Sequence, residues 1–149
     1  MSNDQQAATT INQELTAILG DRVLFRPCAY YDKHMDCIRI ELRDCSVKEL
    51  RLSELLTVHM DNDPEDGQSQ YVGLTIKGVK HVFTELNLPL EGIIRITEIL
   101  NRLSEDFAKA LQNTHEKAMA RDALHTVTSF ARHSELKVDM NSTSLALAA

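Results

Sequence analysis

The chain has 149 residues, of which 43% are hydrophobic and 26% charged, so we expect one folded globular domain and not a disordered segment. Its formal net charge of −6 disfavours non-specific attraction to nucleic acid or anionic lipid, because that attraction requires clustered Lys and Arg. The three cysteines lack zinc-ligand spacing, and the sequence shows neither a signal peptide nor an apolar run of about 20 residues. These features favour a cytoplasmic protein without a membrane span.

The beginning of the chain is expected to be flexible and then helical. Residues 1–10 are polar and predict a flexible N-terminus. Residues 11–19 predict a short amphipathic helix that ends at Gly20. The apolar residues that share one face of this helix are Ile11, Leu15, Ile18 and Leu19.

Residues of about 22–86 have the pattern of a sheet. The clearest strand is 37–43, in which Ile38, Ile40 and Leu42 alternate with charged residues, as is typical of a half-buried antiparallel strand. Further strands are expected at 23–31, 47–52, 55–60 and 71–76, with an acidic loop over 61–67. Short strands in series predict an antiparallel β-meander, and with the flanking helices the fold class is α+β.

From Pro89 the apolar spacing changes to that of a helix. The predicted apolar face, which could meet a second subunit or another partner, consists of Ile93, Ile96, Leu100, Leu103 and Phe107. The helical region, about 88–133, is either one long helix or a hairpin that breaks near Asn113. A continuous helix from Glu91 to His133 would span roughly 60 Å, longer than the sheet can cover, and therefore predicts a homodimer. The single α+β domain is expected over 11–134, with a flexible tail over 135–149.

No pattern of catalytic or ligand-binding residues stands out. The loop that begins at Asp61 resembles the start of a calcium loop, but Gly67 is one position late and Val72 stands where a bidentate Glu belongs. The six histidines form no pair at metal-binding spacing, and no nucleotide or hydrolase motif is present. We therefore expect no metal and no cofactor, and the sequence favours a protein without catalytic activity.

Residues 31–79 carry a recognisable set of turn and strand residues. They are Tyr31, Asp32, Asp36, the alternating strand 38–42, Asp61, Asp63, Gly67 and the Val-Gly-Leu-Thr-Ile strand 72–76. This segment resembles a widespread family of small bacterial domains of unknown function, which implies a small β-sheet module and hints at antitoxin-like partners. Residues 147–149, Leu-Ala-Ala, resemble the end of the bacterial trans-translation degradation tag, with a frayed Ala-rich end as the alternative reading.

The leading functional prediction is a dimeric, non-enzymatic bacterial protein that interacts with or regulates another protein. The alternative is a small-molecule-binding protein, or an unrecognised enzyme, with a pocket between the sheet and the C-terminal helices. Its lining would include Tyr30, Tyr31, His59 and His81. A third possibility is a chaperone or adaptor whose apolar groove holds a secretion or toxin partner.

Overall fold

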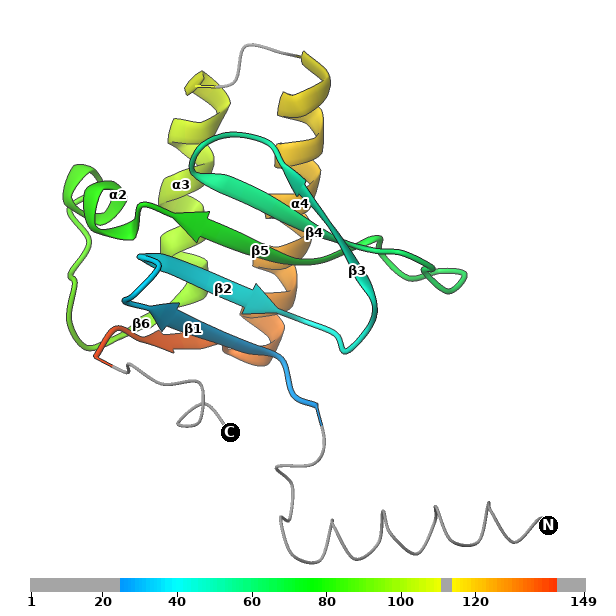
Figure 1. Ribbon diagram of the computed structural model, residues 1–149, viewed down its shortest axis with the longest axis horizontal. Coiled ribbons are helices and arrows are strands. Elements are labelled where there is room, and N and C mark those ends of the chain that lie inside the picture. The colour runs from blue at the N-terminus through cyan, green and yellow to red at the C-terminus, as the bar shows by residue number, and fades with distance from the viewer. Residues whose placement is uncertain (1–24, 111–113, 142–149) are drawn as a thin grey trace, which may run out of the picture.

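The computed structural model describes residues 25–110 and 114–141 (Figure 1). The predicted flexible start over 1–10, the predicted helix over 11–19 and the Leu-Ala-Ala ending at 147–149 lie outside the described residues. The α+β fold class is confirmed: a five-stranded antiparallel sheet packs against C-terminal helices.

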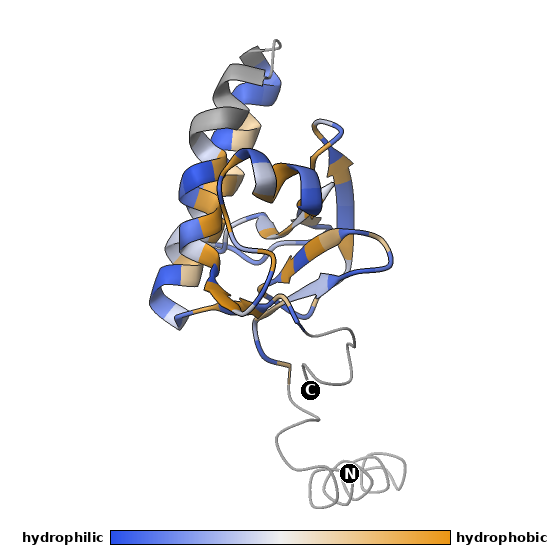
Figure 2. Cartoon of the chain, turned by 90° about the vertical axis from the view of Figure 1, so that its left-hand side faces the viewer, coloured by the Kyte–Doolittle hydropathy of each residue, from blue (hydrophilic) through white to orange (hydrophobic). Residues whose placement is uncertain are grey.

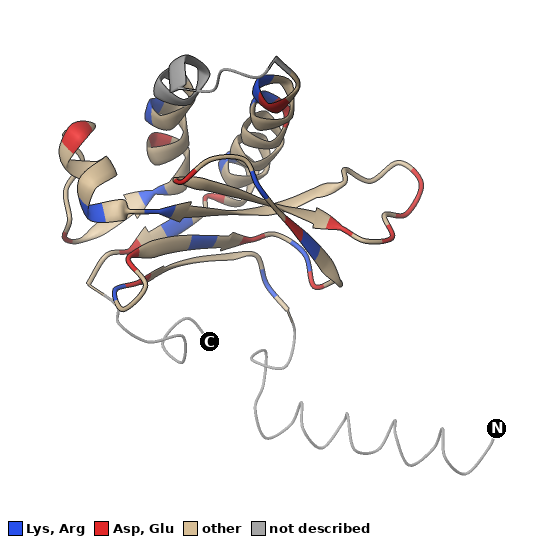
Figure 3. Cartoon of the chain, turned by 45° about the horizontal axis from the view of Figure 1, so that its top comes forward, with Lys and Arg blue, Asp and Glu red and all other residues tan. Residues whose placement is uncertain are grey.

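The sheet consists of β1 (Cys28–Asp32), β2 (Cys37–Glu41), β3 (Val47–Arg51), β4 (Leu56–Asp61) and β5 (Tyr71–Lys77). Their order is β1-β2-β5-β4-β3, which departs from a strict meander because β2 pairs with β5 and not with β3. The composition of the strands explains this order. The apolar strand β5 has its first six residues buried and lies at the centre, whereas the charged strand β3 lies at an edge (Figure 3).

Two helices, α3 (Ile96–Ala110) and α4 (Thr114–Ser134), cover one face of the sheet as a hairpin (Figure 1). Of the two predicted arrangements, the structure therefore has the hairpin and not one long helix. The core lies between this hairpin and the apolar face of the sheet, where the hydrophobic sides of both layers meet (Figure 2). Its largest fully buried side chains include Ile38, Ile40, Leu74, Ile96 and Leu100.

The predicted partner face on the first of these helices needs correction. Ile93 does not lie on a helix; it begins the short strand β6 (Ile93–Arg95), and 69% of its surface is exposed. Ile96, Leu100 and Leu103 lie on α3 but are buried in the core of their own chain, so they are not available to a second subunit. The side chain of Phe107 lies outside the described part of the structure. The homodimer stays a prediction.

The predicted flexible tail is wrong for its first residues. The strand β7 (Lys137–Asp139) pairs with β6, and the N–H of Met140 donates to the carbonyl of Gly92 at 2.8 Å. Leu136, Val138 and Met140 are buried, so alternate residues of this short segment complete the core. Three strand residues are too few for a periodic signal to be recognised in the sequence.

The residues that carry the family resemblance have a structural role at the turn between β1 and β2. The hydroxyl of Tyr31 donates to Asp36 Oδ1 at 2.7 Å, and burial, followed by this bond, raises the pKa of Tyr31 to about 12. Asp36 also accepts the N–H of Lys80 at 3.2 Å, in the first turn of α2 (Val79–Glu85). Asp32 accepts the N–H groups of His34 and Met35. This part of the motif therefore connects the turn to α2.

Candidate functional site

A groove of about 530 Å³ lies between α4 and the part of the sheet where β2 ends and β5 begins. We call it the α4 groove. The sheet side is lined by Leu42, Arg43, Gln68, Ser69, Tyr71 and Val72, and the helix side by His125, Thr126, Ser129, Phe130 and His133. The two strands are joined here by the N–H of Leu42, which donates to the carbonyl of Val72 at 2.9 Å. The site therefore combines three segments that are far apart in the sequence.

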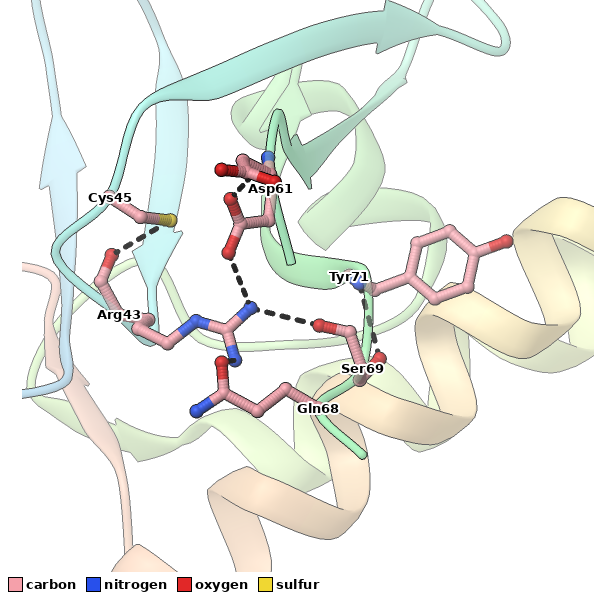
Figure 4. Close-up of polar contacts among 7 residues, drawn as sticks. Arg43, Cys45, Asp61, Gln68, Ser69 and Tyr71 are labelled. Carbon is pink, nitrogen blue, oxygen red and sulfur yellow. Dashed lines mark hydrogen bonds and ion pairs between the residues drawn. The ribbon is translucent and has the colours of Figure 1, made fainter. Parts of the chain in front are cut away.

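Arg43 anchors the polar wall of the α4 groove (Figure 4). Its Nη2 lies 2.9 Å from Asp61 Oδ2 and donates to the carbonyl of Ser69 at 2.9 Å, and its Nη1 donates to Gln68 Oε1 at 2.9 Å. The Asp61 side chain is only 8% exposed, so this is a partly desolvated, charge-assisted contact. Arg43 thereby connects the end of β2 to the acidic loop between β4 and β5 and fixes the shape of this wall.

Aromatic side chains form the apolar part of the α4 groove. Tyr71 is buried and, in Figure 4, its ring points from the start of β5 toward α4. Phe130 projects from α4, and 39% of its surface is exposed. His125, Ser129 and His133 follow each other at intervals of four residues and therefore share one side of α4. The groove is thus apolar in its interior, is bordered by hydrogen-bonding groups, and has no carboxylate among its described lining residues.

His59 occupies a separate position on the face of the sheet that α3 and α4 do not cover. It is 3% exposed, and its Nε2 lies 2.7 Å from Thr75 Oγ1 and 3.7 Å from Glu49 Oε1. Burial lowers the pKa of His59, and the opposing effect of Glu49 is smaller. His59 is therefore a neutral, hydrogen-bonded histidine within the sheet, and it does not line the α4 groove.

The structure does not bring together the four residues that were predicted to line a pocket. Tyr30 is half-buried opposite Arg39, Tyr31 is bonded to Asp36 in the core, and His81 is exposed on α2, 3.9 Å from Glu85. The α4 groove does lie between the sheet and a C-terminal helix, but other residues line it. Sequence reasoning missed Arg43, Tyr71 and Phe130 as site residues. For Phe130 the reason is that periodicity does not reveal which apolar residues stay exposed.

The cysteines and carboxylates give no sign of a reactive centre in the described part of the chain. Burial raises the pKa of the Cys28 and Cys37 thiols, which keeps them protonated at neutral pH, and all three cysteines are free. The described residues contain no group of three or more His, Cys, Asp or Glu side chains arranged to hold a metal ion. Asp61, the first residue of the calcium-like loop, is paired with Arg43. Among the described helices, none is long and apolar enough to cross a membrane.

Comparisons with known proteins give no match to this chain, whether the comparison is with family models, with curated proteins or with solved structures.

Acidification is expected to destabilise the protein through His59. Its pKa in the folded state lies below the ordinary value of 6.5, so below that pH the unfolded chain binds more protons than the folded one. The contribution of His59 to the free energy of unfolding is therefore fully present above about pH 6.5 and is lost as the pH decreases. We expect the urea midpoint to be lower at about pH 5.5 than at about pH 7.5, and this difference to shrink in His59→Gln. His81→Gln, at an exposed site, is the control and should keep the wild-type difference.

Proposed function

We propose that this protein is a non-enzymatic interaction protein that binds an apolar helical segment of a protein partner in the α4 groove. The observation that carries the proposal is the partly exposed Phe130, which lines an open groove together with Tyr71 and a polar border. Aromatic side chains surrounded by hydrogen-bonding residues are typical of protein interfaces. His125 and Ser129 would supply directional contacts around the apolar centre.

The shape of the α4 groove supports a macromolecular ligand over a small molecule. Small-molecule sites are usually closed enough to bury 70–90% of their ligand. The α4 groove is open to solvent, and its volume of about 530 Å³ is bordered by α4 on one side and by the end of β2 and the start of β5 on the other. A groove with these borders suits a helix whose apolar residues recur at intervals of three and four.

The chemistry of the lining supports binding without catalysis. Acid–base and nucleophilic catalysis require a base within hydrogen-bond reach of the group that it activates. Among the described lining residues, no hydroxyl is bonded to an imidazole ring, and His133 Nδ1 instead contacts the backbone carbonyl of Ser129 at 2.8 Å. Arg43 is already paired with Asp61, so its role in the groove is to shape the wall.

A photo-cross-linking experiment in the native cell tests this proposal. We expect p-benzoylphenylalanine in place of Phe130 to form a discrete adduct with one polypeptide. The same group in place of Met35, which is 72% exposed on the turn between β1 and β2, should not form this adduct. Ser129→Arg, which fills the groove beside position 130, should lower the adduct yield several-fold.

Two outcomes would contradict the proposal. An equal adduct from positions 130 and 35 would mean that the contact is not specific to the α4 groove. The absence of a protein adduct, together with a small molecule bound to the native protein as measured by mass spectrometry, would favour the ligand-binding alternative.

A further inference from the structure

A second pocket, of about 200 Å³, lies where the start of α3, the end of α4 and the short strands β6 and β7 meet (Figure 1). We call it the basic pocket, because its lining includes the cations Arg95, Arg132 and Lys137. Glu135 is the one carboxylate among the described lining residues, so three cations and one anion leave a surplus of two positive charges. The chain as a whole has a formal net charge of −6, and the basic pocket shares no lining residue with the α4 groove. It is therefore a separate, positively charged feature of an acidic protein.

Two of these cations face each other across the pairing of β6 with β7. Arg95 lies directly opposite Lys137, and both are exposed because the neighbouring pair, Ile94 and Val138, takes the buried side of the strands. Like charges directly opposite each other destabilise a pair of strands. The strand pairing therefore gains nothing from these two charges, and an anion bound between them would remove the repulsion.

None of the three cations is neutralised by the described part of the protein. Within that part, their side chains make no ion pair and no hydrogen bond. Glu135 therefore pairs with none of them, and Asp139 on β7 instead accepts the N–H of Asn141 at 2.9 Å. Arg132 has a structural explanation in the last turn of α4, where the helix dipole favours a cation. This explanation does not apply to the two cations on the strands.

The first turn of α3 adds groups that also favour an anion. Thr97, the second residue of α3, is one of the lining residues, and its hydroxyl group can donate a hydrogen bond. Backbone N–H groups in a first helical turn lack intrahelical acceptors, and the helix dipole is positive there. Glu98, the acid in this turn, lies 3.9 Å from Arg102 and does not line the pocket. These groups add to the attraction that the three cations provide.

The size of the basic pocket suits one compact anionic group. Its volume of about 200 Å³ is below the roughly 300–1,000 Å³ of sites that enclose a drug-sized ligand. Arginine donates two parallel hydrogen bonds to phosphate or carboxylate oxygens, and lysine binds phosphate as a point charge. Two arginines and a lysine exceed what a carboxylate needs, because a carboxylate has two oxygens and a single negative charge. They match a phosphoryl group, which has three terminal oxygens and a charge of about −2 at neutral pH.

From these observations we infer that the basic pocket binds the phosphoryl group of a soluble phosphate, either inorganic phosphate or a phosphomonoester. Arg95 and Lys137 contact this group from the strands, and Arg132 contacts it from α4. The bound charge cancels the repulsion between Arg95 and Lys137, so binding also stabilises the pairing of β6 with β7. The inference does not depend on the proposed function, because the α4 groove is a different site.

Titration of the isotopically labelled protein with inorganic phosphate, at neutral pH and constant ionic strength, tests the inference. We expect the NMR amide signal of Thr97 to shift and the shift to saturate. Arg132→Gln and Lys137→Gln should each weaken binding about tenfold, as expected for the loss of one hydrogen bond between charged groups. Lys48→Gln removes the same charge from an exposed position on β3 and should leave the affinity unchanged.

The same variants give a second measurement, in buffer without phosphate. Lys137→Gln removes the repulsion with Arg95 and should raise the urea midpoint slightly, whereas Lys48→Gln should not raise it. A lower midpoint in Lys137→Gln would mean that Lys137 stabilises the strand pair by itself, and it would overturn the inference.

The remaining outcomes of the titration are also decisive. Shifts that rise linearly with phosphate, or that are equal in wild type and variants, would overturn the inference, because they would reflect only ionic screening. Equal affinity for acetate would overturn the choice of a phosphoryl group. Glycerol phosphate bound as tightly as inorganic phosphate would support the inference with a phosphomonoester as the ligand, and binding of inorganic phosphate alone would support it with the free ion. None of these outcomes affects the α4 groove, whose partner is tested at Phe130.

Discussion

Ile96→Ala is expected to lower the free energy of unfolding by about 2–5 kcal/mol, whereas Ile93→Ala should change it by less than about 0.5 kcal/mol. Ile96 is fully buried at the start of α3, so its truncation removes apolar contacts and leaves a cavity between the hairpin and the sheet. Ile93, three residues earlier on β6, is 69% exposed, so its truncation removes few apolar contacts. Urea unfolding followed by circular dichroism measures both values.

This pair of variants also tests the predicted homodimer. Both residues belong to one predicted apolar face, yet only Ile96 is covered within the chain. A loss of several kcal/mol in Ile93→Ala would mean that another surface covers Ile93. If the unfolding midpoint also rose with protein concentration, that surface would belong to a second subunit.

Gly73→Ala is expected to lower the free energy of unfolding by about 1–3 kcal/mol, because the added methyl group has no space at this position. A Cβ atom at position 73 would press against the backbone oxygen of Ile40 and would lie 3.0 Å from His59 Nδ1. The oxygen belongs to β2, which is paired with β5 in the middle of the sheet, so it cannot move away without disturbing the strand pairing. Thermal unfolding measures the loss.

Gly67→Asn is the matched control for this substitution. Gly67 has a φ of 80°, and an added Cβ there would meet nothing within 4 Å. Asn tolerates the left-handed region better than most residues, so the expected loss is below about 1 kcal/mol. Equal losses at positions 73 and 67 would contradict the close approach of β5 and β2. An NMR signal of the His59 imidazole that shifts in Gly73→Ala and not in Gly67→Asn would support this close approach.

The strands and helices of this protein were largely predictable from local patterns. The alternation of Ile38, Ile40 and Leu42 predicted β2 and the face that it buries, because side chains alternate strictly along a strand. The spacing of Ile96, Leu100 and Leu103 predicted α3, because these residues recur at the period of a helix. Ile93 fitted the same spacing and was assigned wrongly, since the pattern does not show where a helix begins.

The α4 groove could not be predicted in the same way. Its lining comes from the segments 42–43, 68–72 and 125–133, and no local pattern connects them. Arg43 appeared as one of the solvent-facing charges of an alternating strand. Its contacts with Asp61 and Ser69 depend on the loop between β4 and β5 returning to the end of β2.

The sequence by itself determined the α+β class, the positions of most strands and helices, and the faces that they bury, because these follow from periods of two and 3.6 along the chain. Only the tertiary structure decided the position of β5 between β2 and β4, the pairing of β7 with β6, the burial of Ile96 and Leu100 within one chain, and the α4 groove. The physical reason is that each of these depends on contacts between segments distant in sequence, which many arrangements of the same local elements could satisfy.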